Sequence, residues 1–122
     1  MVSITNINEQ HNKFFQKVMK YYNKALFQGK LKKCCIRFSD DVVDQGIFIP
    51  DVWIEEEKKN AHLIVFTPDI LNDESKELHL KIMHNLIHVW QYENGSPAPD
   101  YGHNEEWVKK AEELGIMCIL EE

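Results

Sequence analysis

The chain is organised around one stretch, ESKELHLKIMHNLIHVWQY, which spans residues 74–92. Apolar residues recur in it at steps of three and four, the spacing that gathers side chains on one face of an α-helix. Asn72 or Asp73 is expected to cap the start of this helix, and Gly95 stands just past its end. Its predicted apolar face consists of Leu78, Ile82, Met83, Leu86, Val89 and Trp90.

Two histidines of this stretch, His84 and His88, are four residues apart. Residues at this spacing project from the same face of a helix, so both imidazoles can reach one metal ion, at about 2.0–2.1 Å for zinc. His103 is the leading candidate for a third ligand, because it follows a loop rich in Gly and Pro and precedes another predicted helix. Three neutral histidines with an open fourth position are typical of a catalytic zinc site. We therefore expect one Zn²⁺.

The N-terminal half contains a helix and several strands. Helical spacing runs through residues 9–28, with Asn6 or Asn8 as the expected cap. In residues 34–38, Cys34, Ile36 and Phe38 alternate with Cys35 and Arg37, which is the two-residue period of a half-buried strand. Three further segments are rich in β-branched and aromatic residues: 46–49, 52–56 and 62–67. A predicted turn between the second and third segments favours a hairpin. We expect a small, mostly antiparallel sheet.

A third, short helix is predicted to begin at Asn104, which can cap it, with Glu105 and Glu106 favourably placed in its first turn. Residues 116–120 are expected to form an apolar tail packed on the rest of the protein. The order of helix, strands, helix and helix indicates an α+β fold. A length of 122 residues corresponds to a single domain, residues 1–122.

Cysteine usage and hydropathy exclude several classes of protein. The three cysteines form no C-x-x-C pair, which argues against a disulfide framework and against a cysteine zinc ribbon. No apolar run is long enough to cross a bilayer, and the N-terminus lacks the pattern of a signal peptide. We therefore expect a cytoplasmic protein with no membrane partner.

The net charge of −6 conceals an uneven distribution. Residues 10–39 contain no Asp or Glu, but they contain eight basic residues. Such a segment can place a basic patch on an acidic protein and bind nucleic acid, which would make the protein nucleoid-associated; the alternative is a solvated helix face. The candidate nucleic-acid residues share helical spacing and are Lys13, Lys17, Lys20 and Lys24.

Four blocks of sequence stand out in order along the chain: YNKALFQGKL (22–31), PDIL (68–71), IMHNLIHVWQ (82–91) and GHNEEW (102–107). Together they resemble the SprT-like (Spartan-type) zinc metalloprotease domain, in which they would be the first helix, the segment leading to the metal helix, that helix and the third-ligand motif. The resemblance implies a zincin-like minimal metalloprotease fold with zinc on His84, His88 and His103. It also implies a protein or peptide substrate, held on DNA in Spartan-type members. The C-terminal zinc ribbon of some members is missing from this sequence.

Asn85 departs from the pattern H-E-x-x-H, in which the Glu takes a proton from the metal-bound water and passes it to the leaving amine. An Asn side chain can hydrogen-bond water but cannot accept its proton, and losing a general base costs about 10²–10⁴ in rate. If Asn85 is natural, the chain is a pseudo-protease that binds peptide or DNA without turnover. If it is an inactivating substitution, the parent protein is a zinc-dependent endopeptidase. Proteolysis by this chain is expected to be impaired in both cases.

Other polar residues receive minor roles. Glu105 and Glu106 are candidates to hydrogen-bond a ligand imidazole from outside the metal shell, or they only stabilise the start of the third helix. His62 lies within a predicted strand and is expected to be structural. His79, five residues before His84, is expected on another helix face in solvent.

Overall fold

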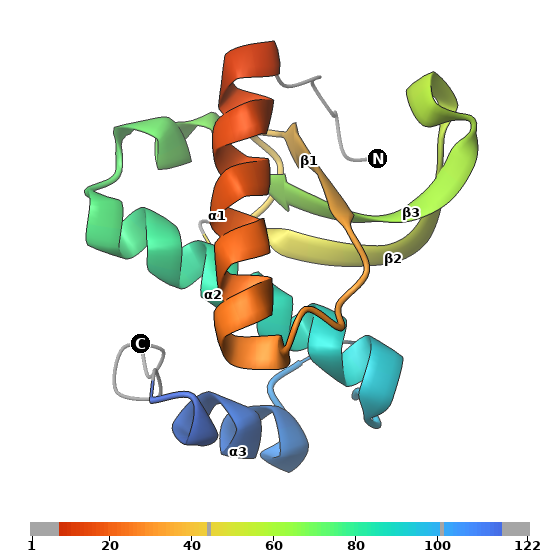
Figure 1. Ribbon diagram of the computed structural model, residues 1–122, viewed down its shortest axis with the longest axis vertical. Coiled ribbons are helices and arrows are strands. Elements are labelled where there is room, and N and C mark those ends of the chain that lie inside the picture. The colour runs from red at the N-terminus through yellow and green to blue at the C-terminus, as the bar shows by residue number, and fades with distance from the viewer. Residues whose placement is uncertain (1–7, 44, 101, 116–122) are drawn as a thin grey trace.

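The computed structural model describes residues 8–43, 45–100 and 102–115. The described residues form helices that lie beside a small curved sheet (Figure 1), so the predicted α+β class is confirmed. The elements are α1 (Glu9–Phe27), β1 (Cys34–Phe38), β2 (Ile47–Ile54), β3 (Lys59–Phe66), α2 (Ser75–Asn94) and α3 (Glu105–Glu113), with 3-10 turns η1 (Glu55–Glu57) and η2 (Pro68–Asn72). The apolar tail expected at residues 116–120 lies outside the described residues, as does Asn6.

Helix α1 begins and ends where its sequence predicts. The side chain of Asn8 caps it by accepting a hydrogen bond from the backbone N–H of His11. Gln28 and Gly29 then adopt positive φ angles of 55° and 73°, which turn the chain out of the helix. Its buried face packs against α2 and the sheet, and the opposite face carries the lysines of the basic segment.

The sheet is mixed, and this differs from the mostly antiparallel sheet that was predicted. Its strand order is β1-β3-β2. Strands β2 and β3 form the expected antiparallel hairpin, joined through η1, whereas β1 runs parallel to β3 on its other edge. An alternating pattern tells which face a residue occupies but not the direction of its neighbour, so the parallel pair was not visible in the sequence. The two segments predicted at 46–49 and 52–56 are one strand, irregular at Asp51, which has a φ of 51°.

Helices α1 and α2 cover one face of the sheet. On β1 the side chains of Cys34, Ile36 and Phe38 point into this main core, as their alternation predicts, and Cys35 joins a smaller cluster on the other face. Burial raises the pKa of the Cys34 thiol to about 12, so this thiol packs in the core and does not act as a nucleophile.

Helix α2 starts without the side-chain cap that was predicted. Its N-cap residue is Glu74, which makes no capping hydrogen bond with its side chain. The carboxylate of Asp73, one of the two expected caps, instead forms an ion pair with Lys81, with its oxygen 2.6 Å from Nζ. Gly95 follows the helix as predicted. Within the described ranges, no helix combines the length and apolar character needed to cross a membrane.

Candidate metal centre

Three histidines come together between α2 and the start of α3. His84 and His88 are buried on α2, and His103 lies in the segment just before α3. The Nε2 atoms of His84 and His103 are 3.2 Å apart, and one ring nitrogen of each histidine lies within 4.8 Å of the others. Ligands of a tetrahedral zinc ion at about 2.0–2.1 Å are roughly 3.3 Å from one another. The three side chains can therefore hold one metal ion after small shifts.

The protonation state of the three imidazoles favours metal binding. Burial, together with repulsion from the neighbouring His88 and His103, lowers the pKa of His84 to about 3. Burial, with repulsion from His103, lowers the pKa of His88 to about 4. Burial also lowers the pKa of His103. All three rings are thus neutral near pH 7, and their lone pairs are available without first losing a proton.

Unpaired polar atoms also mark this region. The Nδ1 atoms of His84 and His88 are buried without a hydrogen-bond partner among the described residues. Leaving such an atom unpaired costs about 1–3 kcal/mol, a cost that structural histidines avoid. These unpaired atoms belong to rings that converge with His103, and neutral imidazole nitrogens suit a metal ion of the zinc type.

The indole ring of Trp107 packs against all three histidine rings. Its ring stacks on His103 with centroids 3.7 Å apart and an angle of 4° between the planes, and it also contacts His84 at 5.0 Å and His88 at 5.3 Å. Helical spacing alone indicates only that Trp107 lies on the buried side of α3. Its spacing of four residues from His103 was the available sign of a role at the site.

Asn85 is fully buried and bonds to the backbone. Its Nδ2 donates to the carbonyl of Gln45 at 2.8 Å and to that of Lys81 at 3.0 Å, while its Oδ1 has no partner among the described residues. The Gln45 contact ties α2 to the turn before β2. The next residue, Gly46, has a φ of 83°, and a Cβ there would lie 2.6 Å from the Phe66 ring. The turn that Asn85 contacts is therefore tightly packed.

The two acidic candidates lie in the first turn of α3, as the second of the two alternatives expected. Glu106 accepts hydrogen bonds from the backbone N–H of Ser96 and from the side chain of Gln91, and these bonds lower the pKa of its carboxyl. It contacts neither ligand imidazole through these bonds. Glu105 is exposed. Sequence reasoning missed Gln91, because nothing in its local sequence shows what a buried amide on α2 would contact.

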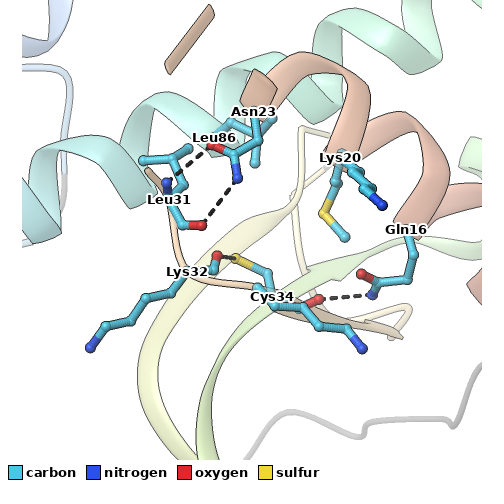
Figure 2. Close-up of a pocket in the computed structure, with 9 residues that line it drawn as sticks. Gln16, Lys20, Asn23, Leu31, Lys32, Cys34 and Leu86 are labelled. Carbon is cyan, nitrogen blue, oxygen red and sulfur yellow. Dashed lines mark hydrogen bonds between the residues drawn. The ribbon is translucent and has the colours of Figure 1, made fainter. Parts of the chain in front are cut away.

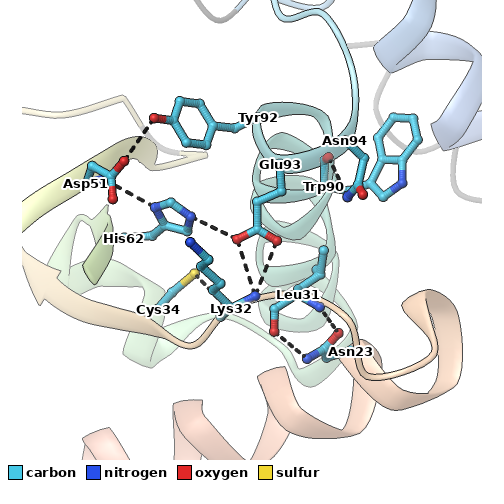
Figure 3. A network of polar contacts seen from close by, with 10 residues as sticks. All are labelled: Asn23, Leu31, Lys32, Cys34, Asp51, His62, Trp90, Tyr92, Glu93 and Asn94. Carbon is cyan, nitrogen blue, oxygen red and sulfur yellow. Dashed lines mark hydrogen bonds and ion pairs between the residues drawn. The ribbon is translucent and has the colours of Figure 1, made fainter. Parts of the chain in front are cut away.

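Two further histidines, His62 and His79, have hydrogen-bond partners outside this group. His62 lies outside the group of three: its Nε2 is 2.9 Å from Glu93, and its Nδ1 accepts from the backbone N–H of Asp51 at 3.2 Å, as Figure 3 shows. His79 was expected in solvent, but it is partly buried and its Nδ1 is 2.8 Å from the hydroxyl of Tyr22.

The comparisons with known proteins give one result. The family model described as SprT-like family matches residues 15–118. Neither the curated proteins nor the solved structures compared with this chain gave a significant match. The matched range contains all three histidines that can hold a metal ion. Because the match covers most of the sequence, the chain belongs to the SprT-like family.

Proposed function

We propose that the protein is a zinc-binding domain of the metallopeptidase type in which the proton-transfer step of proteolysis is impaired, so that it holds a protein substrate without efficient turnover. His84, His88 and His103 would bind one Zn²⁺, which supplies Lewis-acid chemistry when bound. Neutral rings at pH 7 and the family match support the metal-binding part of this proposal.

The hydrogen bonds of Asn85 are the observation that carries the proposal. A general base at this position must have a free carboxylate, yet position 85 holds an amide whose N–H groups are bonded to two backbone carbonyls. The equally short carboxylate of Asp would face those carbonyl oxygens with no donor to offset the repulsion, whereas the carboxylate of Glu extends one methylene further. Position 85 thus contributes to packing between α2 and the turn before β2.

An exposed strand edge supports a peptide as the molecule that is bound. In the sheet that the structure describes, β2 is an edge strand, paired with β3 on one side only. Unpaired backbone groups of an edge strand can bind an extended peptide by adding it to the sheet. Helix α2, which carries two of the histidines, contacts the same strand.

The test compares the chain with its Asn85→Glu and Asn85→Gln variants on an unfolded protein substrate with zinc present. Asn85→Gln is the matched control, because it has the length of Glu without a base. We expect little cleavage by the chain and by Asn85→Gln, and a gain of about 10² or more for Asn85→Glu. Zinc content should be equal in all three. Robust zinc-dependent cleavage by the unsubstituted chain would contradict the proposal, and inactivity of every form would leave only peptide binding.

A second candidate, nucleic-acid binding through α1, is favoured by the exposed side chains of that helix. All four lysines of the predicted stripe are exposed, and Lys13 makes only an exposed ion pair with Glu9 at 3.5 Å. Phe14 and Tyr21 are 46% and 66% exposed on the same helix. Aromatic rings between lysines suit nucleic acid, because bases can stack on the rings while the lysines neutralise phosphates.

A cavity beside α1 extends the basic surface. It has a volume of about 360 Å³, and Figure 2 shows Lys20 and Lys32 at its edge; Lys33 also lines it. Two amides shape its wall, since Gln16 donates to the carbonyl of Cys34 and Asn23 bonds to the backbone of Leu31. The cavity thus joins the lysines of α1 to those that precede β1.

Replacing Lys13, Lys17, Lys20 and Lys24 together with Gln tests this candidate. We expect loss of binding to a labelled oligonucleotide in low-salt anisotropy titrations, and a steep fall in affinity of the unsubstituted chain as salt rises. A control variant changes four exposed lysines elsewhere, Lys58, Lys59, Lys76 and Lys109, to Gln. Equal affinity in the two variants would show that the stripe is only a solvated helix face.

A further inference from the structure

The three candidate ligands differ in how the fold holds them. His84 and His88 are one turn apart on α2, so the helix itself fixes their separation. His103 is exposed and follows a loop, residues 95–102, that leads from α2 back to the other two histidines. The strength of metal binding therefore depends on how firmly this loop is held before the metal arrives.

A buried amide on α2 bonds to the far end of this loop. Gln91 lies one turn after His88 and is fully buried. Its Nε2 donates to Oδ1 of Asn104 at 2.7 Å and to Oε1 of Glu106 at 2.9 Å. Both partners are acceptors, so the amide can make these two bonds only with its NH₂ group turned toward them.

The same side chains also bind the beginning of the loop. Oε1 of Glu106 accepts from the backbone N–H of Ser96 at 2.7 Å, and Nδ2 of Asn104 donates to the carbonyl of Ser96 at 3.0 Å. At Gly95 a Cβ would overlap Oε1 of Glu106, so a larger residue there would have to displace this carboxylate. The two ends of the loop are thus bonded to each other and to α2.

We propose that Gln91, Asn104 and Glu106 form a polar clamp that positions His103 and thereby sets the metal affinity of the site without contacting the ion. This inference rests on the proposed metal binding. Asn104 is adjacent to His103 and also caps α3 by accepting from the N–H of Trp107 at 3.1 Å. The clamp therefore fixes both the ligand and the indole that stacks on it.

Gln91→Glu is the variant with the largest expected effect. It keeps the size of the side chain but turns two donors into acceptors that face Glu106 and Asn104, so the loop should loosen. Changes to residues that orient metal ligands typically lower metal affinity by about 10–100-fold, and we expect a loss in this range. Glu106→Gln should cause a smaller loss, because an amide can still accept from Ser96.

The experiment measures zinc affinity by competition with a chromophoric chelator for the full chain, both single variants and the double variant Gln91→Glu with Glu106→Gln. In the double variant a donor and an acceptor again face each other between positions 91 and 106, so affinity should partly recover. Glu112→Gln, an exposed carboxylate of α3, is the matched control and should bind as the unsubstituted chain does.

Each outcome bears on a different claim. Folded single variants, verified by circular dichroism without metal, that bind zinc as tightly as the unsubstituted chain would reject the clamp. A double variant weaker than both singles would reject the pairing of positions 91 and 106. If Gln91→Glu does not fold, Glu106→Gln alone decides the question. Failure of the unsubstituted chain to bind zinc would instead reject the metal site itself.

Discussion

Buried histidines occur in two contrasting settings in this protein. His62 is 2% exposed, and both of its ring nitrogens have partners, Glu93 on one side and the backbone of Asp51 on the other (Figure 3). His84 and His88 are buried almost as deeply, yet each has an Nδ1 atom without a partner among the described residues.

The difference separates a structural histidine from a binding one. The bonds of His62 join β3 to the end of α2, and they leave no lone pair for an ion. The rings of His84, His88 and His103 face one another instead, where burial and mutual repulsion keep them neutral. Burial alone does not indicate function; three neutral rings with nitrogens that converge on one point do.

Metal content should show the largest difference between the two settings. We expect about one zinc per chain in the unsubstituted protein, close to none in His84→Ala, and nearly full content in His62→Ala. Elemental analysis after gel filtration measures this. His62→Ala should instead lose about 1–3 kcal/mol of stability, because Glu93 loses its buried partner. Loss of zinc from His62→Ala while it remains folded would remove the distinction.

Zinc should stabilise the unsubstituted chain and His62→Ala against unfolding, but not His84→Ala. A ligand that binds only the folded state adds about 2.7 kcal/mol to the free energy of unfolding at a free concentration 100 times its Kd. Thermal unfolding with zinc and with a chelator should show this gain in the unsubstituted chain and in His62→Ala. His84→Ala should unfold at the same temperature in both conditions.

Acid should destabilise the metal-free protein through His84 and His88. Their folded pKa values, about 3 and about 4, lie below the ordinary histidine value of 6.5, so the unfolded chain binds more protons as the pH falls below 6.5. The free energy of unfolding should therefore decrease from pH 6.5 toward pH 4, by at most about 1.4 kcal/mol per pH unit for each histidine.

Urea unfolding with a chelator at pH 7, 6 and 5 measures this slope. The double variant His84→Ala with His88→Ala serves as the control, because it lacks both depressed pKa values, and its slope should be shallower. Equal slopes in the two proteins would mean that these rings do not control acid stability.

The sequence predicted the features that depend on local spacing. The pair His84 and His88 needs only a helix, and His103 needs a short loop that returns, so the structure brings all three together as expected. The alternation in β1 likewise predicted which side chains enter the core. That the bound metal is zinc, and that there is one ion, remain predictions.

Features that depend on distant partners could not be predicted. The parallel pairing of β1 with β3 is set by strand order, which no local pattern contains. Asn72 or Asp73 was expected to cap α2, but neither does, and Asp73 instead pairs with Lys81, two turns along the helix. The roles of Gln91 and Glu106 depend on contacts between α2 and α3 that exist only in the folded chain.

The position of the candidate ligands along the chain has a consequence for folding kinetics. His84, His88 and His103 come from one continuous stretch, so assembling them requires only the closure of one short loop. Pairing Cys34 of β1 with His62 of β3 instead requires the closure of a longer loop, which contains β2. Local contacts form faster than distant ones, so this stretch can assemble before the sheet is complete.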